Sequence, residues 1–149
     1  MNISKVFIAG DHAAYDLKNK CKEILANLGF EVIDLGTDSP DISVDYPDFA
    51  YELSKKVLET KDSYGVLICG TGIGISIAAN RNAGIRCALC HDSFTAKMAR
   101  EHNDANVLCF GSRVVGIGVV EDMCKVFFNT EFACGRHERR VKKLNSCLN

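Results

Sequence analysis

The sequence lacks the features that mark membrane-bound, exported or nucleic-acid-binding proteins. Its 149 residues include 18 basic and 19 acidic ones, so the formal net charge is only -1. This balance provides no basic surface for nucleic acid. No apolar stretch approaches the length of about 20 residues that a membrane-spanning helix needs. The opening run up to Gly10 is too short for the apolar core of a signal peptide. We therefore expect a cytoplasmic protein that binds neither membranes nor nucleic acids.

Linkers, internal repeats and low-complexity segments are also absent from the chain. The length suffices to bury one proper hydrophobic core. We therefore expect residues 1–149 to form a single domain.

The eight cysteines lack the arrangement of a disulfide framework or a zinc site. Cys87, Cys90 and Cys109 lie in apolar, strand-like runs, where a free cysteine acts as a small hydrophobic residue. Cys87 and Cys90, followed by His91, have the spacing of metal ligands, but no second pair follows at a suitable distance. Because Cys87 and Cys90 fall within an expected strand, a thiol redox protein is also disfavoured. We expect reduced thiols and no bound metal.

Short apolar, β-branched runs alternate with segments of helical periodicity along the whole chain. This alternation predicts an α/β fold, a doubly wound, Rossmann-like three-layer sandwich with a five-stranded parallel sheet. Gly29 is a suitable residue to end the first helix, Pro47 suits the first turn of the second, and Asp92 suits the N-cap of a later one. The expected strands are 5–10, 31–35, 66–69, 85–90 and 107–110, and the expected helices are 17–28, 47–58, 75–82, 92–100, 118–128 and 136–148.

The ends of the expected strands carry most of the chemically active side chains. Sheets of this class bind ligands at the carboxyl ends of their strands. Those ends hold Asp11 and His12, then Cys69 to Gly74, then His91, then Gly111 to Arg113. We therefore expect these residues to collect along one edge of the sheet.

Three alternating glycines follow Cys69 in the sequence Gly70-Thr71-Gly72-Ile73-Gly74. Alternating glycines let the backbone turn sharply and bring its amide groups close to an anion, and a helix follows them. The same amides would favour the thiolate of Cys69 over its thiol. The spacing is neither that of a dinucleotide-binding motif nor that of a Walker loop, so no nucleotide cofactor is indicated. The loop predicts an anion cradle with a basic sulfur, although a plain strand-turn-helix junction would also fit.

Basic side chains near the end of the chain suit a phosphate group. Arg136 and Arg140 are four residues apart and so share one face of the expected helix, and Arg113 follows the last strand. A solvated helix face would explain the pair equally well. His102 and Asn103 close a helix, where a polar helix end with a surface histidine is the commoner explanation.

Taken together, these motifs resemble those of type B ribose-5-phosphate isomerases. The resemblance is colinear over nearly the whole chain and rests on six separated motifs. They are Gly10-Asp11-His12, Asp45-Tyr46-Pro47, the segment Ile68 to Asn80, the segment Glu101 to Asn106, Phe110-Gly111-Ser112-Arg113 and the segment Arg136 to Arg140.

The resemblance implies interconversion of D-ribose 5-phosphate and D-ribulose 5-phosphate through a cis-enediol(ate), a step of the non-oxidative pentose phosphate pathway, without metal or organic cofactor. Cys69 would be the base that moves a proton between C1 and C2. Thr71 and the loop amides would hold the oxyanion. His102, paired with Asn103, would open the furanose ring. Some members of the family use a Glu in this loop, but Ile73 and Ile75 stand nearby here, so Cys69 is the only candidate base in the loop.

The resemblance also implies which residues bind the substrate. Asp11 would contact sugar hydroxyls, while His12, Arg113, Arg136 and Arg140 would hold the phosphate. The full set of implied substrate contacts is Asp11, His12, Tyr46, Gly70, Gly72, Ile73, Gly74, Asn103, Arg113, Arg136 and Arg140.

Members of this family place the site between subunits, so the resemblance implies a homodimer or a dimer of dimers. An allose-6-phosphate or galactose-6-phosphate isomerase of the same family is an alternative. Galactose-6-phosphate isomerases divide the catalytic groups between two different subunits, whereas this chain holds both Cys69 and His102. A non-catalytic phosphosugar sensor is the alternative from another class, but such a protein has no need of the Cys69 thiol.

Overall fold

The computed structural model describes residues 2–147 and contains one five-stranded sheet, in which every pair of neighbouring strands is parallel. The strand order is β2-β1-β3-β5-β4. The predicted doubly wound α/β fold is therefore confirmed. The strands are β1 (Lys5–Gly10), β2 (Glu31–Asp34), β3 (Ser63–Cys69), β4 (Cys87–Leu89) and β5 (Val107–Gly111).

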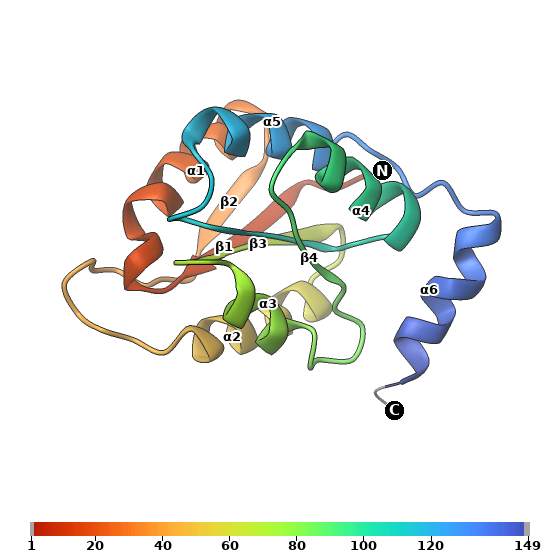
Figure 1. Ribbon diagram of the computed structural model, residues 1–149, viewed down its shortest axis with the longest axis horizontal. Coiled ribbons are helices and arrows are strands. Elements are labelled where there is room, and N and C mark those ends of the chain that lie inside the picture. Colours follow the sequence, from red (N-terminus) through yellow and green to blue (C-terminus); the bar gives the residue numbers. More distant parts are fainter. Residues whose placement is uncertain (1, 148–149) are drawn as a thin grey trace.

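Helices cover both faces of this sheet, which gives three layers (Figure 1). One face is covered by α1 (Tyr15–Asn27), α4 (Ser93–Asn103) and α5 (Ile117–Phe127), and the other by α2 (Tyr46–Glu59) and α3 (Ile73–Ala79). A 3-10 turn, η1 (His12–Ala14), follows β1, and α6 (Arg136–Ser146) stands apart beyond one end of the sheet. The last residue of the helix predicted over 136–148 lies outside the described residues. None of the described helices is long and apolar enough to cross a membrane.

The core is divided by the sheet into two apolar clusters. Successive residues of β1 point to opposite faces, so Val6 and Ile8 join the cluster under α1 and α5, while Phe7 and Ala9 join the cluster under α2. Because β1 is covered on both faces, it reads as a continuous apolar run in the sequence.

Three predicted helix-end residues have the expected local chemistry, although α3 begins and ends earlier than its predicted range of 75–82 and α4 continues to Asn103, beyond the predicted residue 100. Gly29 follows α1 with a φ of +95°, a conformation that suits glycine. Asp92 caps α4, because its Oδ1 accepts a hydrogen bond from the amide of Thr95 at 2.7 Å. Pro47 lies in the first turn of α2.

The fourth strand is shorter than the predicted range 85–90. The amide of Ile85 donates to the carbonyl of Asn82, which continues the turn after α3. The amide of Arg86 donates to the side chain of Asn106 at 2.8 Å. Turn and side-chain bonds thus take up the amides of these two residues, although the carbonyl of Arg86 accepts the amide of Asn106 at 3.1 Å, and regular pairing begins at Cys87.

Candidate active site

Cys69 is the last residue of β3, and the glycine loop that follows it folds back onto its sulfur. The amide of Gly72 donates a hydrogen bond to Cys69 Sγ at 3.1 Å. Gly72 has a φ of +78°, and a Cβ atom there would lie 2.5 Å from Leu89 and 2.8 Å from the backbone of Phe110, so only glycine fits. Because an amide donor stabilises negative charge on sulfur, this contact suits a thiolate.

The loop after β5 holds the glycine loop in place. The amide of Ser112 donates to the carbonyl of Cys69 at 2.8 Å, and the amide of Arg113 donates to the carbonyl of Gly70 at 3.0 Å. A Cβ atom on Gly111 would lie within 2.7 Å of three backbone atoms of Thr71. The two loops are therefore packed backbone against backbone.

The side chains of Arg113 and Tyr46 frame this loop from two sides. A Cβ atom on Gly70 would lie 3.3 Å from Nη1 of Arg113, so the guanidinium group passes directly beside that glycine. A Cβ atom on Gly74 would lie 2.5 to 2.8 Å from the ring and hydroxyl of Tyr46. A cation and a phenol thus border the mouth of the loop, where the hydroxyl of Thr71 accepts the amide of Ile73 at 3.2 Å.

Asp11 and His12 follow β1 at the same edge of the sheet. The amide of Asp11 donates to the carbonyl of Ile68, one residue before Cys69. The Nδ1 atom of His12 accepts the amide of Val44 at 3.2 Å. In neutral His12 the proton therefore sits on Nε2, which leaves that nitrogen as a donor for an anion.

A buried lysine anchors the segment that carries Val44. Lys18 Nζ donates to Asp34 Oδ1 at 2.6 Å and to the carbonyl of Thr37 at 2.9 Å. Burial raises the pKa of Asp34, but hydrogen bonds from Lys18 and Lys22 outweigh this effect and hold that pKa below its usual value. The ion pairs thus fix the start of the long connection between β2 and α2, close to His12.

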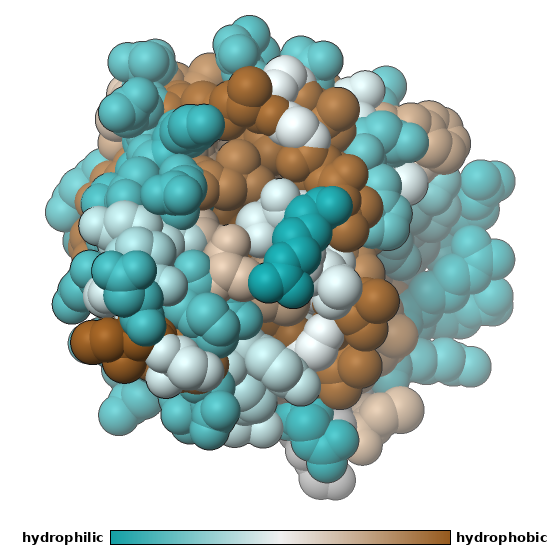
Figure 2. Space-filling model, turned by 60° about the vertical axis from the view of Figure 1, so that its left-hand side comes forward, coloured by the Kyte–Doolittle hydropathy of each residue, from teal (hydrophilic) through white to brown (hydrophobic). Residues whose placement is uncertain are grey.

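The carboxyl edge of the sheet carries ten of the predicted residues and is bordered by exposed apolar side chains. Figure 2 shows this end of the molecule, where apolar groups surround a paler hollow crossed by a hydrophilic side chain. Phe94 is 69% exposed and Ile77 is 58% exposed. The predicted residues here are Asp11, His12, Tyr46, Cys69, Gly70, Thr71, Gly72, Ile73, Gly74 and Arg113.

His102 and Asn103 lie at the opposite, amino edge of the sheet. They end α4, which starts after the carboxyl end of β4 and returns to the start of β5. An α-helix of this length spans about 15 Å. A nearby backbone contact confirms the position, because the carbonyl of Asn106 accepts the amide of Gly65 near the start of β3. Within one chain, His102 and Cys69 are therefore kept apart.

Arg136 and Arg140 are exposed on α6, beside this amino edge. The imidazole rings of His102 and His137 stack with centroids 4.3 Å apart and an interplanar angle of 14°. Partial burial, followed by the charges of His102, Arg136 and Arg140, lowers the pKa of His137. The sequence did not predict this stack, because the spacing of two histidines 35 positions apart carries no structural signal.

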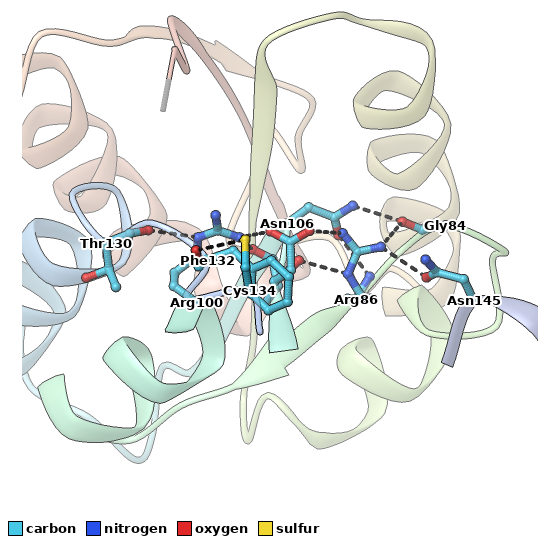
Figure 3. Close-up of polar contacts among 10 residues, drawn as sticks. Gly84, Arg86, Arg100, Asn106, Thr130, Phe132, Cys134 and Asn145 are labelled. Atoms are coloured by element: carbon cyan, nitrogen blue, oxygen red, sulfur yellow. Dashed lines mark hydrogen bonds and ion pairs between the residues drawn. The ribbon is translucent and has the colours of Figure 1, made fainter. Parts of the chain in front are cut away.

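Two arginine networks, one around the buried Arg100 and one around the partly exposed Arg86, fix the segment that leads to α6 and α6 itself (Figure 3). Arg100 donates to the carbonyls of Thr130 and Ala105 at 3.2 and 2.6 Å. Arg86 donates to the carbonyl of Asp104 at 2.8 Å and to Asn145 Oδ1 at 3.1 Å. The helix is thereby held at its far end by Asn145 and near its start by the histidine stack.

A cavity of about 360 Å³ opens beneath α6, lined among others by Asn80, Arg86, Asn103 and Leu144. Two of its polar side chains are bonded to neighbours, since Asn80 binds the backbone of Cys87 and Arg86 binds Asp104. Cys69 and the glycine loop lie at the other, carboxyl edge of the sheet.

The pair Cys87 and Cys90 has the chemistry of buried thiols. Burial raises the pKa of Cys90 to about 12, and its Sγ donates to the carbonyl of Ala88. Within residues 2–147, no three histidine, cysteine or acidic side chains cluster as metal ligands would.

Comparison with known proteins gives one consistent picture. The model of the Ribose/Galactose Isomerase family matches residues 6–144. Ribose-5-phosphate isomerase B of Escherichia coli is 40% identical over 144 residues, which cover 97% of this chain and 96% of the relative. The crystal structure of a ribose 5-phosphate isomerase from Thermotoga maritima has a TM-score of 0.92 at 46% identity, covering 95% of this chain and 97% of that one. Ribose 5-phosphate isomerase B from Anaplasma phagocytophilum has a TM-score of 0.91 at 49% identity, covering 97% and 98%.

Proposed function

Because this chain belongs to the ribose/galactose isomerase family, we propose that it interconverts D-ribose 5-phosphate and D-ribulose 5-phosphate. The observation that carries the proposal is the thiol of Cys69, held by the amide of Gly72 inside a glycine loop beside Arg113. A binding protein would need the glycines and the arginine, but not the thiol. In the non-oxidative pentose phosphate pathway, this reaction would connect the aldose and ketose forms of the five-carbon phosphate.

Cys69 acts as the base in this proposal. Its thiolate removes the proton from C2 of the open-chain aldose, the C2–H electron pair forms the C1–C2 double bond, and the aldehyde π electrons move to O1. The Cys69 thiol then returns a proton to C1, while a proton passes from O2 to O1 and O2 becomes the ketone. Cys69 is only 4% exposed, so its charge would react in a site largely shielded from water.

The negative charge that develops on the substrate oxygen would be held by Thr71 and by the loop amides of Gly70 to Gly74. Preorganised donors of this kind lower the barrier because they need not reorient as charge forms. The bonds from Ser112 and Arg113 to the loop carbonyls support such a fixed geometry. Asp11 would bind a sugar hydroxyl at the same edge.

We place the reaction between two copies of the chain. Cys69 lies at the carboxyl edge and His102 at the amino edge, so one chain alone cannot bring both to one sugar. In a two-fold dimer, the carboxyl edge of each chain would receive α6 and the end of α4 from its partner. The exposed apolar side chains of Ile77 and Phe94 and the exposed arginines of α6 supply surfaces for this contact.

Each site would then contain residues from both copies. His12 and Arg113 of one chain and Arg136 and Arg140 of its partner would hold the phosphate, which bidentate guanidinium groups bind well. His102 of the partner, next to its Asn103, would open the furanose ring by proton transfer. Its stacked neighbour His137 would keep the imidazole in a fixed orientation.

The proposal is tested by turnover of ribose 5-phosphate by purified protein in EDTA, beside the variant Cys69→Ala. Metal-independent activity that vanishes in the variant is expected. Allose 6-phosphate in a parallel reaction reports the six-carbon alternative, since one extra carbon changes selectivity only modestly. Phosphosugar binding without turnover of either sugar would contradict the isomerase and favour a sensor.

A further inference from the structure

Cys109 is a buried thiol that the proposed mechanism does not use. It lies on β5, fully buried on the face covered by α2 and α3, and in the sequence it resembles an ordinary core residue. Its Sγ, however, donates a hydrogen bond to the carbonyl of Gly72 at 3.2 Å. The thiol therefore contacts the glycine loop from the side of the hydrophobic core.

Gly72 forms hydrogen bonds with both Cys109 and Cys69. Its amide donates to Cys69 Sγ at 3.1 Å, and its carbonyl accepts from Cys109 at 3.2 Å and from the amide of Ser76 at 3.2 Å. With a φ of +78° and no room for a Cβ atom, the residue lies clamped between Leu89 and the backbone of β5. The amide and the carbonyl of Gly72 belong to two adjacent peptide planes that meet at its Cα atom, so a carbonyl that is held in place limits how far the torsions of Gly72 can shift and move the amide away from Cys69.

The direction of this contact follows from the state of the Cys109 thiol. Burial, followed by the neighbouring thiol of Cys87, raises the pKa of Cys109 well above its ordinary value. Cys109 therefore keeps its proton throughout the neutral range, and the carbonyl of Gly72 can only accept. A protonated donor is what a positioning role requires.

We propose that Cys109 is a positioning residue for Cys69: its thiol fixes the Gly72 carbonyl and so holds the Gly72 amide against the Cys69 sulfur. The expected effect of Cys109 on turnover rests on the proposed function, whereas its expected effect on the reactivity of Cys69 does not. Removing the donor leaves the Gly72 amide less firmly held at the Cys69 sulfur, which weakens the stabilisation of negative charge on that sulfur and lowers its reactivity as a nucleophile.

The test compares Cys109→Ala with Cys109→Ser and with Cys87→Ala. The serine variant keeps a donor, while Cys87 is a buried cysteine on the same sheet face and one strand farther from the loop. Iodoacetamide alkylation of Cys69 is followed by mass spectrometry of its peptide, which separates it from the exposed Cys134 and Cys147. Thermal unfolding is measured on every variant to report packing alone.

In Cys109→Ala, we expect alkylation of Cys69 at pH 7 to slow about threefold, the factor that one modest hydrogen bond supplies. Cys109→Ser should recover most of the loss, and Cys87→Ala should match the wild type. Isomerase kcat should fall in Cys109→Ala and recover in Cys109→Ser in the same way.

Equal alkylation profiles for wild type and Cys109→Ala would overturn the inference, and so would equal slowing in Cys87→Ala. Both results would make Cys109 a packing residue only. If the wild type failed to turn over any phosphosugar while Cys109→Ala still slowed alkylation, the proposed function would fail and the positioning role would stand.

Discussion

Mixing two inactive variants tests whether each site draws groups from two chains. Cys69→Ala removes the proposed base and His102→Asn removes the proposed ring-opening group, and α4 keeps these residues at opposite edges of one chain. In a mixed dimer, one site combines the intact Cys69 loop of one chain with the intact His102 of the other. The second site carries both changes. Each mixed dimer should therefore regain one complete site.

The expected recovery follows from symmetry. Equal amounts of the two chains, unfolded and refolded together, give mixed dimers as half of the population, and each has one active site of two. Activity on cyclic ribose 5-phosphate should rise from near zero to about one quarter of the wild-type value. The assay follows ribulose 5-phosphate formation before and after refolding.

A matched control places both changes on one chain, in Cys69→Ala/His102→Asn mixed equally with wild type. Every mixed dimer then has two defective sites, so activity should fall on refolding from about one half to about one quarter. A site contained in one chain predicts the reverse pattern: no recovery in the first mixture and no fall in the second. That outcome would refute the two-chain arrangement.

Three further outcomes are expected. His102→Asn should reduce turnover of the cyclic sugar far more than turnover of an acyclic analogue, and equal losses would remove the ring-opening role. Arg140→Ala should chiefly raise KM for the sugar phosphate, with kcat little changed. An unaltered KM would show that Arg140 does not bind the phosphate. Asp34→Ala should lower the free energy of unfolding at pH 7 by about 3 kcal/mol, because it leaves the buried charge of Lys18 unpaired. The pKa of Asp34 is lowered in the folded protein, so its contribution to the free energy of unfolding is present above the ordinary carboxyl pKa near 4 and is lost as the pH falls through the lowered value. Urea unfolding curves of the variant and the wild type should therefore converge in acid.

The sequence predicted the parallel sheet and its carboxyl-edge residues because both depend on local patterns. Buried strands read as apolar runs, and Asp11, Cys69 and Arg113 all follow or end such runs. Gly72 shows the same principle at one residue, since its positive φ and its contact with β5 leave room for no other side chain. Local requirements of this kind determine which residue types occur at these positions, so they can be recognised in the sequence.

The order of the strands and the contacts at the amino edge could not be predicted in this way. β5 lies between β3 and β4, and α3 and α4 cover opposite faces of the sheet, an arrangement that no local spacing encodes. The stack of His102 on His137 and the bond from Cys109 to Gly72 both join distant segments. The resemblance named His102 as catalytic, but only the topology shows that it cannot reach Cys69 of its own chain.

The proposed proton transfer by Cys69 through an enediolate is tested by running the reaction in D₂O and following it by NMR. A thiol exchanges its proton with solvent, so we expect deuterium at C1 of ribulose 5-phosphate with the wild type and none with folded Cys69→Ala. Turnover without solvent deuterium in the product, or equal incorporation by the variant, would show that Cys69 is not the base.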